Sequence, residues 1–435
     1  SEARSYVRCR YLAYRYLYKG ASMIDEEYKK SDGKPFMIYT PERINIMITS
    51  QQHIEEMDKA LRRDLSLHAV AKDLIQPKHT LRGFVWKDQR GVEGTGFFRA
   101  IRNLLTANLP LLMPRISEAI SSQFEIELQN NADFMEAALS FPEDVYVAAE
   151  IIRLLPKFIG PMAARFATRG HKSTFVLYDC LYPVIANRMR AKNQAPCVCR
   201  EASQDNDAIQ WLIDTVPKRE NWSTERLVGE IVAVWYASIH TLATSMAYAL
   251  IDLYSHPEYI EPLRREVEGP LFKKFQTTSE GLPEIDSFLK ESTRLSYFES
   301  SFIRRQALRD YRFFDGTNVK KGSWVCVPYR SMLRDENTYP HALIFDGRRF
   351  LQLDHGNTPK SSSLSHHSSD WLVWGSGRIT CPGRFYATLV LKLVIAHMVR
   401  NYDCELEPIE GNISFQWRSA LIPKNTVTLR VKRHV

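Results

Sequence analysis

Apolar and polar residues alternate with different periods along this chain, and the change of period predicts where helices and strands lie. Residues 34–49 hold two β-rich runs separated by a Thr-Pro-Glu-Arg turn, which predicts a β-hairpin. From about residue 50 to residue 295 helical patterns dominate. After residue 297 short β-like runs alternate with turns such as Asp315-Gly316, and residues 389–408 predict a helix that passes into a final strand or two. The pattern therefore predicts a mainly α protein with small β-sheets near both ends of the chain.

One predicted helix is apolar on almost every face. Within residues 227–259, Glu230 and His240 are the only ionisable groups before Asp252, and Ser223-Thr224-Glu225 offers a helix start. Such a helix is expected to be central and buried. Taken alone, His240 and Thr241 are explained by a hydrogen-bonded core histidine and a hydroxyl that bonds to the preceding turn.

Composition and charge narrow the class of protein. The chain has 435 residues, of which 44% are hydrophobic, so it can bury a large core, and length alone would allow two or three domains. The net charge of +8 comes from scattered basic residues, which favours an anionic membrane surface or an acidic protein over nucleic acid. Seven cysteines without regular spacing argue against a disulfide framework and favour a reducing compartment.

The sequence lacks a run of roughly 18 uninterrupted apolar residues, which a membrane-spanning helix needs. We therefore expect the chain as given to be soluble. It begins with serine, and arginines stand where the core of a signal peptide would be apolar. We expect that an upstream segment has been removed.

The candidate chemistry centres on Cys381, which lies in WGSGRITCPGR (residues 374–384) just ahead of an apolar helix. Backbone N–H groups and the dipole of the helix would lower the pKa of this thiol and favour the thiolate as a metal ligand. Pro382 suits the first position of a helix. A zinc site needs three or four ligands, and no second Cys or His lies within ten residues of Cys381. A single protein thiolate is sufficient for heme iron.

This loop resembles the cysteine-ligand loop of the cytochrome P450 family, Phe-x-x-Gly-x-Arg-x-Cys-x-Gly, with Trp374 in the place of Phe. Three further motifs occur in the family's order. SIHT at 238–241 is similar to the oxygen-activating turn of the long central helix, KESTR at 290–294 to the Glu-x-x-Arg helix, and FDGRRF at 345–350 to the arginine-bearing segment after it. Stretches such as AIQWLIDT and CPGRFYATLVLKL resemble fungal members that tailor secondary metabolites.

The resemblance implies a mainly α fold with small β-sheets, in which residues 1–435 form one heme-enclosing catalytic domain. It makes Cys381 the axial ligand of a b-type heme iron. Arg378, taken as the arginine of the loop pattern, and Arg305 would pair with the heme propionates.

The neighbours of Cys381 have implied roles as well. Gly375 and Gly377 would let the loop pass close beneath the porphyrin, and Gly383 would let helix and loop pack tightly. Trp374 would shield the sulfur and offer its indole N–H to a group nearby.

Two more groups of residues receive roles from the resemblance. Thr241 would deliver protons during oxygen activation, and His240 would relay them. Glu291, Arg294 and Arg349 would form a buried ion network that holds the region behind the heme. Taken without the resemblance, two residues spaced like Glu291 and Arg294 on one helix face most often form a surface ion pair.

The implied activity is that of a monooxygenase that inserts one atom of O2 into a bulky lipophilic secondary metabolite, such as a terpenoid, indole alkaloid or polyketide. The segments that grip substrate in the family correspond to residues 74–86 and 155–168, and both are largely apolar. One alternative is desaturation, oxidative coupling or rearrangement at the same heme. A heme sensor or carrier without turnover is more remote, because a carrier has no need of the Thr241 proton relay.

Partners and location follow from the same resemblance. NADPH would supply electrons through the flavins of an NADPH-cytochrome P450 reductase, with cytochrome b5 as a second candidate donor. A membrane anchor upstream of this chain would hold the full-length protein on the cytosolic face of the endoplasmic reticulum. We expect no nucleic-acid partner.

Overall fold

The computed structural model describes residues 2–86, 100–125, 132–194, 207–217, 220–353 and 359–434. These residues form two compact units. The first comprises Ser1–Leu67, Leu109–Ser122 and Leu242–Val435, and the second comprises His68–Asn108 and Gln123–Thr241. Helices dominate both units, and every sheet of two or more strands lies in the described part of the first unit. The division into units leaves the single catalytic domain over residues 1–435 a prediction.

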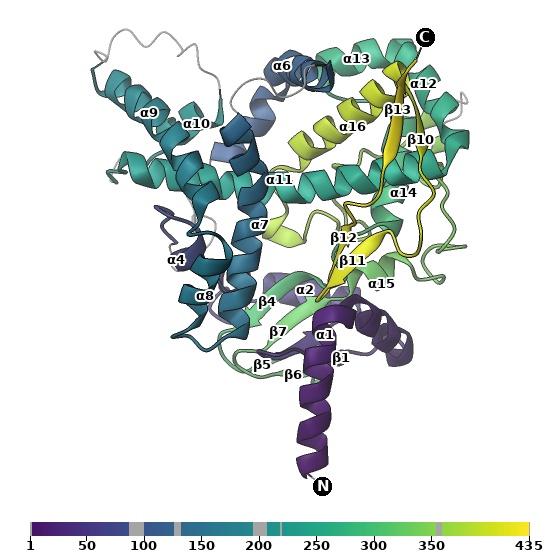
Figure 1. Cartoon of the computed structure of the whole chain (residues 1–435). Coiled ribbons are helices and arrows are strands. Elements are labelled where there is room, and N and C mark those ends of the chain that lie inside the picture. The colour runs from purple at the N-terminus through teal and green to yellow at the C-terminus, as the bar shows by residue number, and fades with distance from the viewer. Residues whose placement is uncertain are drawn as a thin grey trace. The chain divides into compact units, whose positions relative to one another are not determined.

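The main sheet of the first unit joins strands near the N-terminus with strands that follow residue 300 (Figure 1). Its order is β1-β2-β7-β4-β3, formed by β1 (Phe36–Tyr39), β2 (Ile44–Met47), β3 (Leu65–Ser66), β4 (Phe302–Ala307) and β7 (Trp324–Val327). β1 and β2 make the predicted hairpin, with Phe36 opposite Met47. β2 then pairs in parallel with β7, where Asn45 lies opposite Trp324. The hairpin prediction is confirmed, whereas the pairing with β7 has no local signal.

Four two-stranded sheets complete the β-structure of the described residues. They pair β5 (Tyr311–Arg312) with β6 (Asn318–Val319), β8 (Gln352–Leu353) with β9 (Pro359–Lys360), β10 (Tyr402–Leu406) with β13 (Leu429–Arg433), and β11 (Ser414–Trp417) with β12 (Ala420–Pro423). β5 and β6 flank the predicted Asp315-Gly316 turn, and β10 directly follows the last helix, as predicted.

The helices of the first unit are α1 (Glu2–Ser31), α2 (Gln51–Lys59), most of α6 (Thr106–Glu125), η3 (Pro257–Tyr259), α12 (Ile260–Glu268), α13 (Pro270–Thr278), α14 (Pro283–Leu295), α15 (Tyr329–Leu333), η4 (Gly377–Ile379) and α16 (Arg384–Asn401). Some of these helices contact the main sheet, as α1 and α15 do, and others pack on one another, as α12, α13, α14 and α16 do. α1 contacts β1 and the β11–β12 hairpin, and α16 contacts α12 and α14 (Figure 1). Nine of the 13 residues of α14 are shielded from solvent, a larger share than the ten of 18 in α16.

The second unit is a helical array. Its elements are α3 (Leu67–Ile75), α4 (Pro77–Thr80), the π-helix η2 (Ile101–Leu105), α7 (Ala132–Leu154), α8 (Gly160–Ala167), α9 (Lys172–Gln194), α10 (Ala208–Asp214) and the first part of α11 (Thr224–Ser255). α7 packs against α8 and α9. Asp207 starts α10 by accepting a hydrogen bond from the backbone N–H of Gln210 (3.0 Å), which satisfies one of the free donors at a helix start.

α11 begins at Thr224, as the sequence predicts, but it is not buried along its whole length. Leu227 and Leu253, near its two ends, are 0% exposed. In the middle of the helix, Ala237 and Thr241 are exposed. The prediction of burial on every face is therefore wrong for the middle of α11. By length and composition α11 could also cross a membrane, a test that core helices of soluble proteins pass as well.

The backbone of α11 approaches another segment of the second unit very closely at Gly229. A Cβ atom built on Gly229 would lie 2.5 Å from the carbonyl carbon of Gly83 and from the nitrogen of Phe84. Tyr178 closes the same contact, because its hydroxyl lies 2.9 Å from the carbonyl oxygen of Arg82 and 2.7 Å from that of Glu225. Only glycine fits at position 229 without displacing backbone.

We expect Gly229→Ala to lower the free energy of unfolding by roughly 1–3 kcal/mol, because the added methyl group overpacks this contact. Alanine in place of glycine inside an unobstructed helix has the opposite effect, of about 1 kcal/mol. The sign of the change in a urea titration is therefore diagnostic. A stabilised variant would show that the approach of α11 is looser than the structure describes.

Candidate active site

The loop that carries Cys381 turns sharply before α16. Gly375 and Gly377 have φ angles of 98° and 56°, which glycine adopts without strain. A Cβ atom on Gly377 would also lie 2.9 Å from the carboxylate carbon of Asp58. The backbone N–H of Cys381 donates to the carbonyl oxygen of Trp374 at 2.7 Å and closes the loop. The glycines are thus required by the path of the backbone.

The Cys381 sulfur is surrounded by donors. Burial raises the pKa of this thiol, and it outweighs the lowering effects of the backbone N–H groups of Gly383 and Arg384 and of the Arg384 charge. The expected net lowering is therefore wrong for the thiol by itself, because desolvation disfavours the thiolate. Coordination to a cation removes the thiol proton, and the two N–H groups then stabilise the sulfur anion. This donor set fits a thiolate ligand of heme iron.

The indole of Trp374 is held by a hydrogen bond. Its Nε1–H donates to the carbonyl oxygen of Leu364 at 2.7 Å. The predicted donation to a nearby group therefore goes to a backbone carbonyl of the preceding segment. A phenylalanine, the residue of the family pattern, has no such donor.

Arg305 meets a partner that sequence analysis missed. Its guanidinium is 4% exposed and donates to Asp58 Oδ1 at 3.0 Å, and the Ser376 hydroxyl donates to the same oxygen at 2.7 Å. Burial lowers the pKa of Arg305 to about 10, and Asp58 opposes this shift. Asp58 lies on α2 and links β4 to the cysteine loop. A guanidinium has five N–H donors, so the hydrogen bond to Asp58 does not use all of those on Arg305. Binding of a heme propionate by Arg305 stays a prediction.

Arg378 lies exposed on η4. It stands three residues before Cys381, whereas the arginine of the family pattern stands two residues before the cysteine, where this chain has Ile379. The identification of Arg378 with the pattern's arginine is therefore wrong by one position. Its pairing with a propionate stays a prediction that rests on its exposure beside the loop.

The structure brings Glu291, Arg294 and Arg349 together. Arg294 donates to both carboxylate oxygens of Glu291 at 2.8 Å, and both side chains are 0% exposed. Arg349 Nε lies 3.1 Å from the same carboxylate. Arg294 also donates to the carbonyl oxygens of Leu333 and Ala342 at 2.7 and 2.8 Å. A buried network of this kind ties α14 to the segment from 333 to 349, and the surface-pair alternative is wrong.

Thr241 and His240 belong to the last residues of the second unit, whereas Cys381 and Glu291 belong to the first. The Thr241 hydroxyl donates to the carbonyl oxygen of Ala237 on the preceding turn at 3.3 Å, and its side chain is exposed. His240 is partly exposed. The proton-relay roles of both residues stay predictions.

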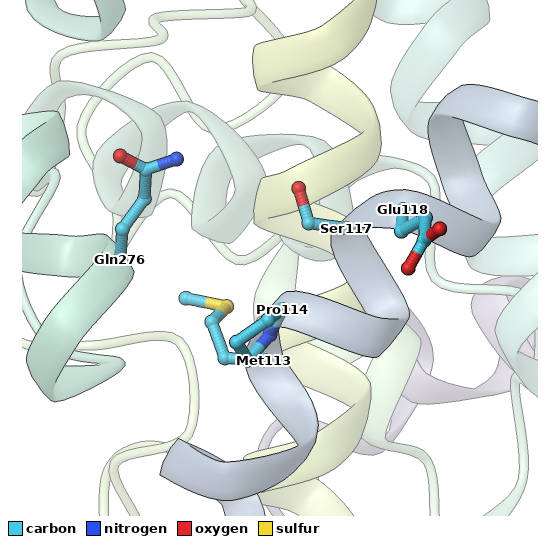
Figure 2. Close-up of a pocket in the computed structure, with 5 residues that line it drawn as sticks. All are labelled: Met113, Pro114, Ser117, Glu118 and Gln276. Atoms are coloured by element: carbon cyan, nitrogen blue, oxygen red, sulfur yellow. The ribbon is translucent and has the colours of Figure 1, made fainter.

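A pocket of about 350 Å³ opens between α6 and α13 of the first unit. Figure 2 shows Gln276 facing the α6 side chains across it, and Met113, Pro114, Ser117 and Glu118 form the rest of its lining. It contains none of the predicted site residues. Among the described ranges, no three His, Cys, Asp or Glu side chains gather as they would around a metal ion. The cysteine loop is thus the part of the structure with the clearest chemistry.

Comparison with known proteins points to one family. The family model described as Cytochrome P450 matches residues 121–431. The protein described as Cytochrome P450 monooxygenase ptmQ of Penicillium ochrochloron is 25% identical over 90% of this chain and 84% of its own length. Cytochrome P450 monooxygenase janQ of Penicillium janthinellum is 26% identical over 96% of this chain and 90% of its own length.

Solved structures are similar in fold. The crystal structure of a cytochrome P450, CYP102L1, aligns with a TM-score of 0.64 at 16% identity and covers 95% of this chain and 94% of that one. The retinoic acid bound cyanobacterial CYP120A1 aligns with a TM-score of 0.62 at 18% identity and covers 94% of each chain. The expected mainly α fold with small sheets is confirmed.

We expect Glu291→Ala or Arg294→Ala to yield little soluble protein with heme. Removing Glu291 leaves the buried Arg294 without its counter-charge, at a cost of roughly 3–5 kcal/mol. Removing Arg294 leaves Glu291 with Arg349 as its remaining ion-pair partner and leaves the carbonyl oxygens of Leu333 and Ala342 without their donor. Arg348→Ala is the matched control, because Arg348 pairs with Glu284 at 3.2 Å while its side chain is 50% exposed. Thermal melting and heme content of the purified variants measure the effect, and normal values for Glu291→Ala would contradict it.

Proposed function

Because this chain belongs to the cytochrome P450 family of heme monooxygenases, we propose that it inserts one atom of O2 into a lipophilic secondary metabolite. Electrons would come from NADPH through a flavoprotein reductase. The observation that carries the proposal is Cys381, a thiol beside two backbone N–H donors at the start of α16.

The proposed cofactor is heme b, and Cys381 is the residue that would hold its iron. When bound, a thiolate-ligated heme supplies the electron donation that favours cleavage of the O–O bond. The protein's part is to hold the thiolate in place. The loop would hold it through the conformations of its glycines and through two hydrogen bonds. One joins the backbone N–H of Cys381 to the carbonyl oxygen of Trp374, and the other joins the Ser376 hydroxyl to Asp58.

Thr241 would move a proton during turnover. Its hydroxyl is exposed on the middle of α11, where the neighbouring Ala237 is also small and exposed, so a substrate could approach the helix there. The bond to the Ala237 carbonyl at 3.3 Å fixes the hydroxyl rotor while leaving its acceptor lone pairs available. His240 would relay protons, because an imidazole ring can both accept and donate a proton.

Association with a membrane is supported by exposed apolar side chains in both units. On α8 and the residues before it, Phe158, Met162 and Phe166 are 78%, 69% and 90% exposed. On α1, four side chains spaced by four, three and four residues are exposed by about half or more: Val7, Tyr11, Tyr14 and Tyr18. Exposed apolar side chains that are grouped on a helix beside basic residues, as on α1 and α8, are typical of proteins that lie on a lipid surface. We propose the cytosolic face of the endoplasmic reticulum as the location.

These exposures change the interpretation of residues 155–168. We predicted that this segment grips substrate, but its large apolar side chains lie on the surface of the second unit. They support contact with a lipid surface from which a lipophilic substrate would enter. The terpenoid, indole alkaloid or polyketide class stays the proposed range of substrates.

A reductase would dock through electrostatic attraction between its acidic surface and basic residues of this chain. The chain carries a net charge of +8, and Arg378 is exposed within the cysteine loop itself. An acidic flavoprotein surface complements such a face. NADPH-cytochrome P450 reductase is the proposed donor, with cytochrome b5 as a second one.

We expect the purified protein with heme to show a reduced carbon monoxide complex that absorbs at about 450 nm, because a thiolate lies opposite the carbon monoxide, whereas histidine leaves the band at about 420 nm. Cys381→Ser should lose the 450 nm band. Cys404→Ser is the control, because Cys404 is another partly exposed thiol of the first unit. Retention of the 450 nm band in Cys381→Ser would contradict the assignment of Cys381 as the heme ligand.

We expect Thr241→Ala to keep heme and substrate binding but to uncouple the reaction. NADPH consumption should continue while hydrogen peroxide replaces oxygenated product, because proton delivery would be lost where bound substrate has expelled most of the water. Thr241→Ser retains the hydroxyl and should restore coupling. Product, NADPH and peroxide are measured together, and an unchanged ratio of product to NADPH in Thr241→Ala would show that Thr241 has no part in proton delivery.

A further inference from the structure

An ion pair buried behind the cysteine loop joins two helices of the first unit. Lys392 on α16 donates to Asp286 Oδ2 on α14 at 2.5 Å, and each residue is 2% exposed. Lys392 also donates to the carbonyl oxygen of Gly281 at 2.6 Å. Buried ion pairs add little stability over apolar residues of the same size, because both charges lose their hydration. A positional role is therefore the natural explanation for this pair.

The second carboxylate oxygen of Asp286 binds the segment that precedes the cysteine loop. Asp286 Oδ1 accepts the backbone N–H of Leu364 at 2.8 Å, and Leu364 is 1% exposed. One carboxylate thus fixes three parts of the chain: α14, α16 and the segment around Leu364. Without this acceptor the Leu364 N–H would be buried and unpaired, which is costly.

Leu364 passes this fixed position to the loop. Its carbonyl oxygen accepts the indole N–H of Trp374 at 2.7 Å, and the carbonyl oxygen of Trp374 accepts the N–H of Cys381 at 2.7 Å. Trp374 and Ile379 are the positions at which this loop departs from the family pattern. A phenylalanine in the place of Trp374 could not make the hydrogen bond to Leu364. The hydrogen-bonded path from Asp286 to Cys381 therefore depends on the tryptophan.

A second anchor on α14 supports the same segment. Lys290, one turn after Asp286, donates to the Ser362 hydroxyl at 2.6 Å. Its ammonium lies 4.6 Å from the ring centre of Phe350 and 4.9 Å from that of Trp371. The segment around Leu364 and helix α14 are thus joined at two points. These points are two residues apart in the segment and four residues apart on the helix.

We propose that Asp286, paired with Lys392, is a positioning residue for the Cys381 thiolate, and that it acts through Leu364 and Trp374. The inference rests on the proposed ligation of heme by Cys381. It predicts that the sulfur leaves the iron more readily when the hydrogen bond between Asp286 and the Leu364 N–H is lost. Loss of the Asp286 and Lys392 charges alone should not have this effect.

Two double variants separate the effect of the hydrogen bond to the Leu364 N–H from the effect of the Asp286 and Lys392 charges. Asp286→Asn with Lys392→Met removes both charges and keeps an acceptor for the Leu364 N–H. Asp286→Leu with Lys392→Met removes both charges and the acceptor. Both remove the Asp286–Lys392 pair as a whole, and both take the Asp286 charge away from the buried Lys290 to the same extent. Lys290 keeps its hydrogen bond to Ser362 and its contacts with Phe350 and Trp371, so both variants are expected to fold.

The readout is the rate at which the reduced carbon monoxide complex converts from the band at about 450 nm to the band at about 420 nm, which reports loss of the thiolate. It is followed at a temperature at which circular dichroism shows every protein folded, and at equal heme content. We expect the Asp286→Leu pair to convert about fivefold faster or more, the effect of losing one hydrogen bond. The Asp286→Asn pair should convert within about twofold of the unchanged protein, since its acceptor bond remains. Equal rates in the two pairs would overturn the proposal.

Trp374→Phe tests the path at a different bond and does not depend on the folding of the double variants. It should convert faster by itself, and in its background the difference between the two Asp286 variants should vanish. A rate equal to that of the unchanged protein, or a difference that persists in the Trp374→Phe background, would also overturn the proposal.

Glu42→Gln controls for general destabilisation. Glu42 pairs with the buried Arg418 at 2.6 Å in the first unit. It should melt earlier but convert at the unchanged rate below its melting temperature, and faster conversion would show that any lost ion pair has this effect. If the unchanged protein has no band at about 450 nm, the proposed ligation by Cys381 fails, and the inference fails with it.

Discussion

The first unit depends on the burial of charged side chains on α14. Asp286, Lys290, Glu291 and Arg294 are all at most 4% exposed. A charge buried without a partner costs several kcal/mol, so each of the four requires a group of fixed position. Those groups come from α16, from the segment around residue 362 and from the segment from 333 to 349. One helix therefore sets where three otherwise separate parts of the chain lie.

The position of Cys381 follows from this arrangement. The loop is tied to α14 through Leu364 and to α2 through the bond between Ser376 and Asp58. Its own sequence contributes the glycines that permit the turn and the N–H donors that face the sulfur. A ligand thiolate must hold one geometry while the iron changes its charge state, and bonds from two sides restrict its movement.

Polar residues of the two units carry different parts of the proposed chemistry. The thiolate and the buried ion network lie in the first unit, and the hydroxyl of Thr241 lies at the end of the second. α11 is the continuous helix that contains the border between them. In the middle of this helix Ala237 and Thr241 are exposed, whereas residues near its two ends are buried.

Contiguous residues were sufficient to predict the hairpin at 34–49, the start of α11 at Thr224 and the Glu291–Arg294 pair, because backbone periodicity and turn chemistry act over a few residues. The motifs likewise identified Cys381 as the candidate ligand. They gave no sign of Asp58, 318 residues before Ser376, of Asp286 as the acceptor for Leu364, or of the exposed middle of α11. Such contacts join segments far apart in the sequence, and their partners are chosen only when the packing of the whole unit desolvates a charge and leaves one group within reach of it.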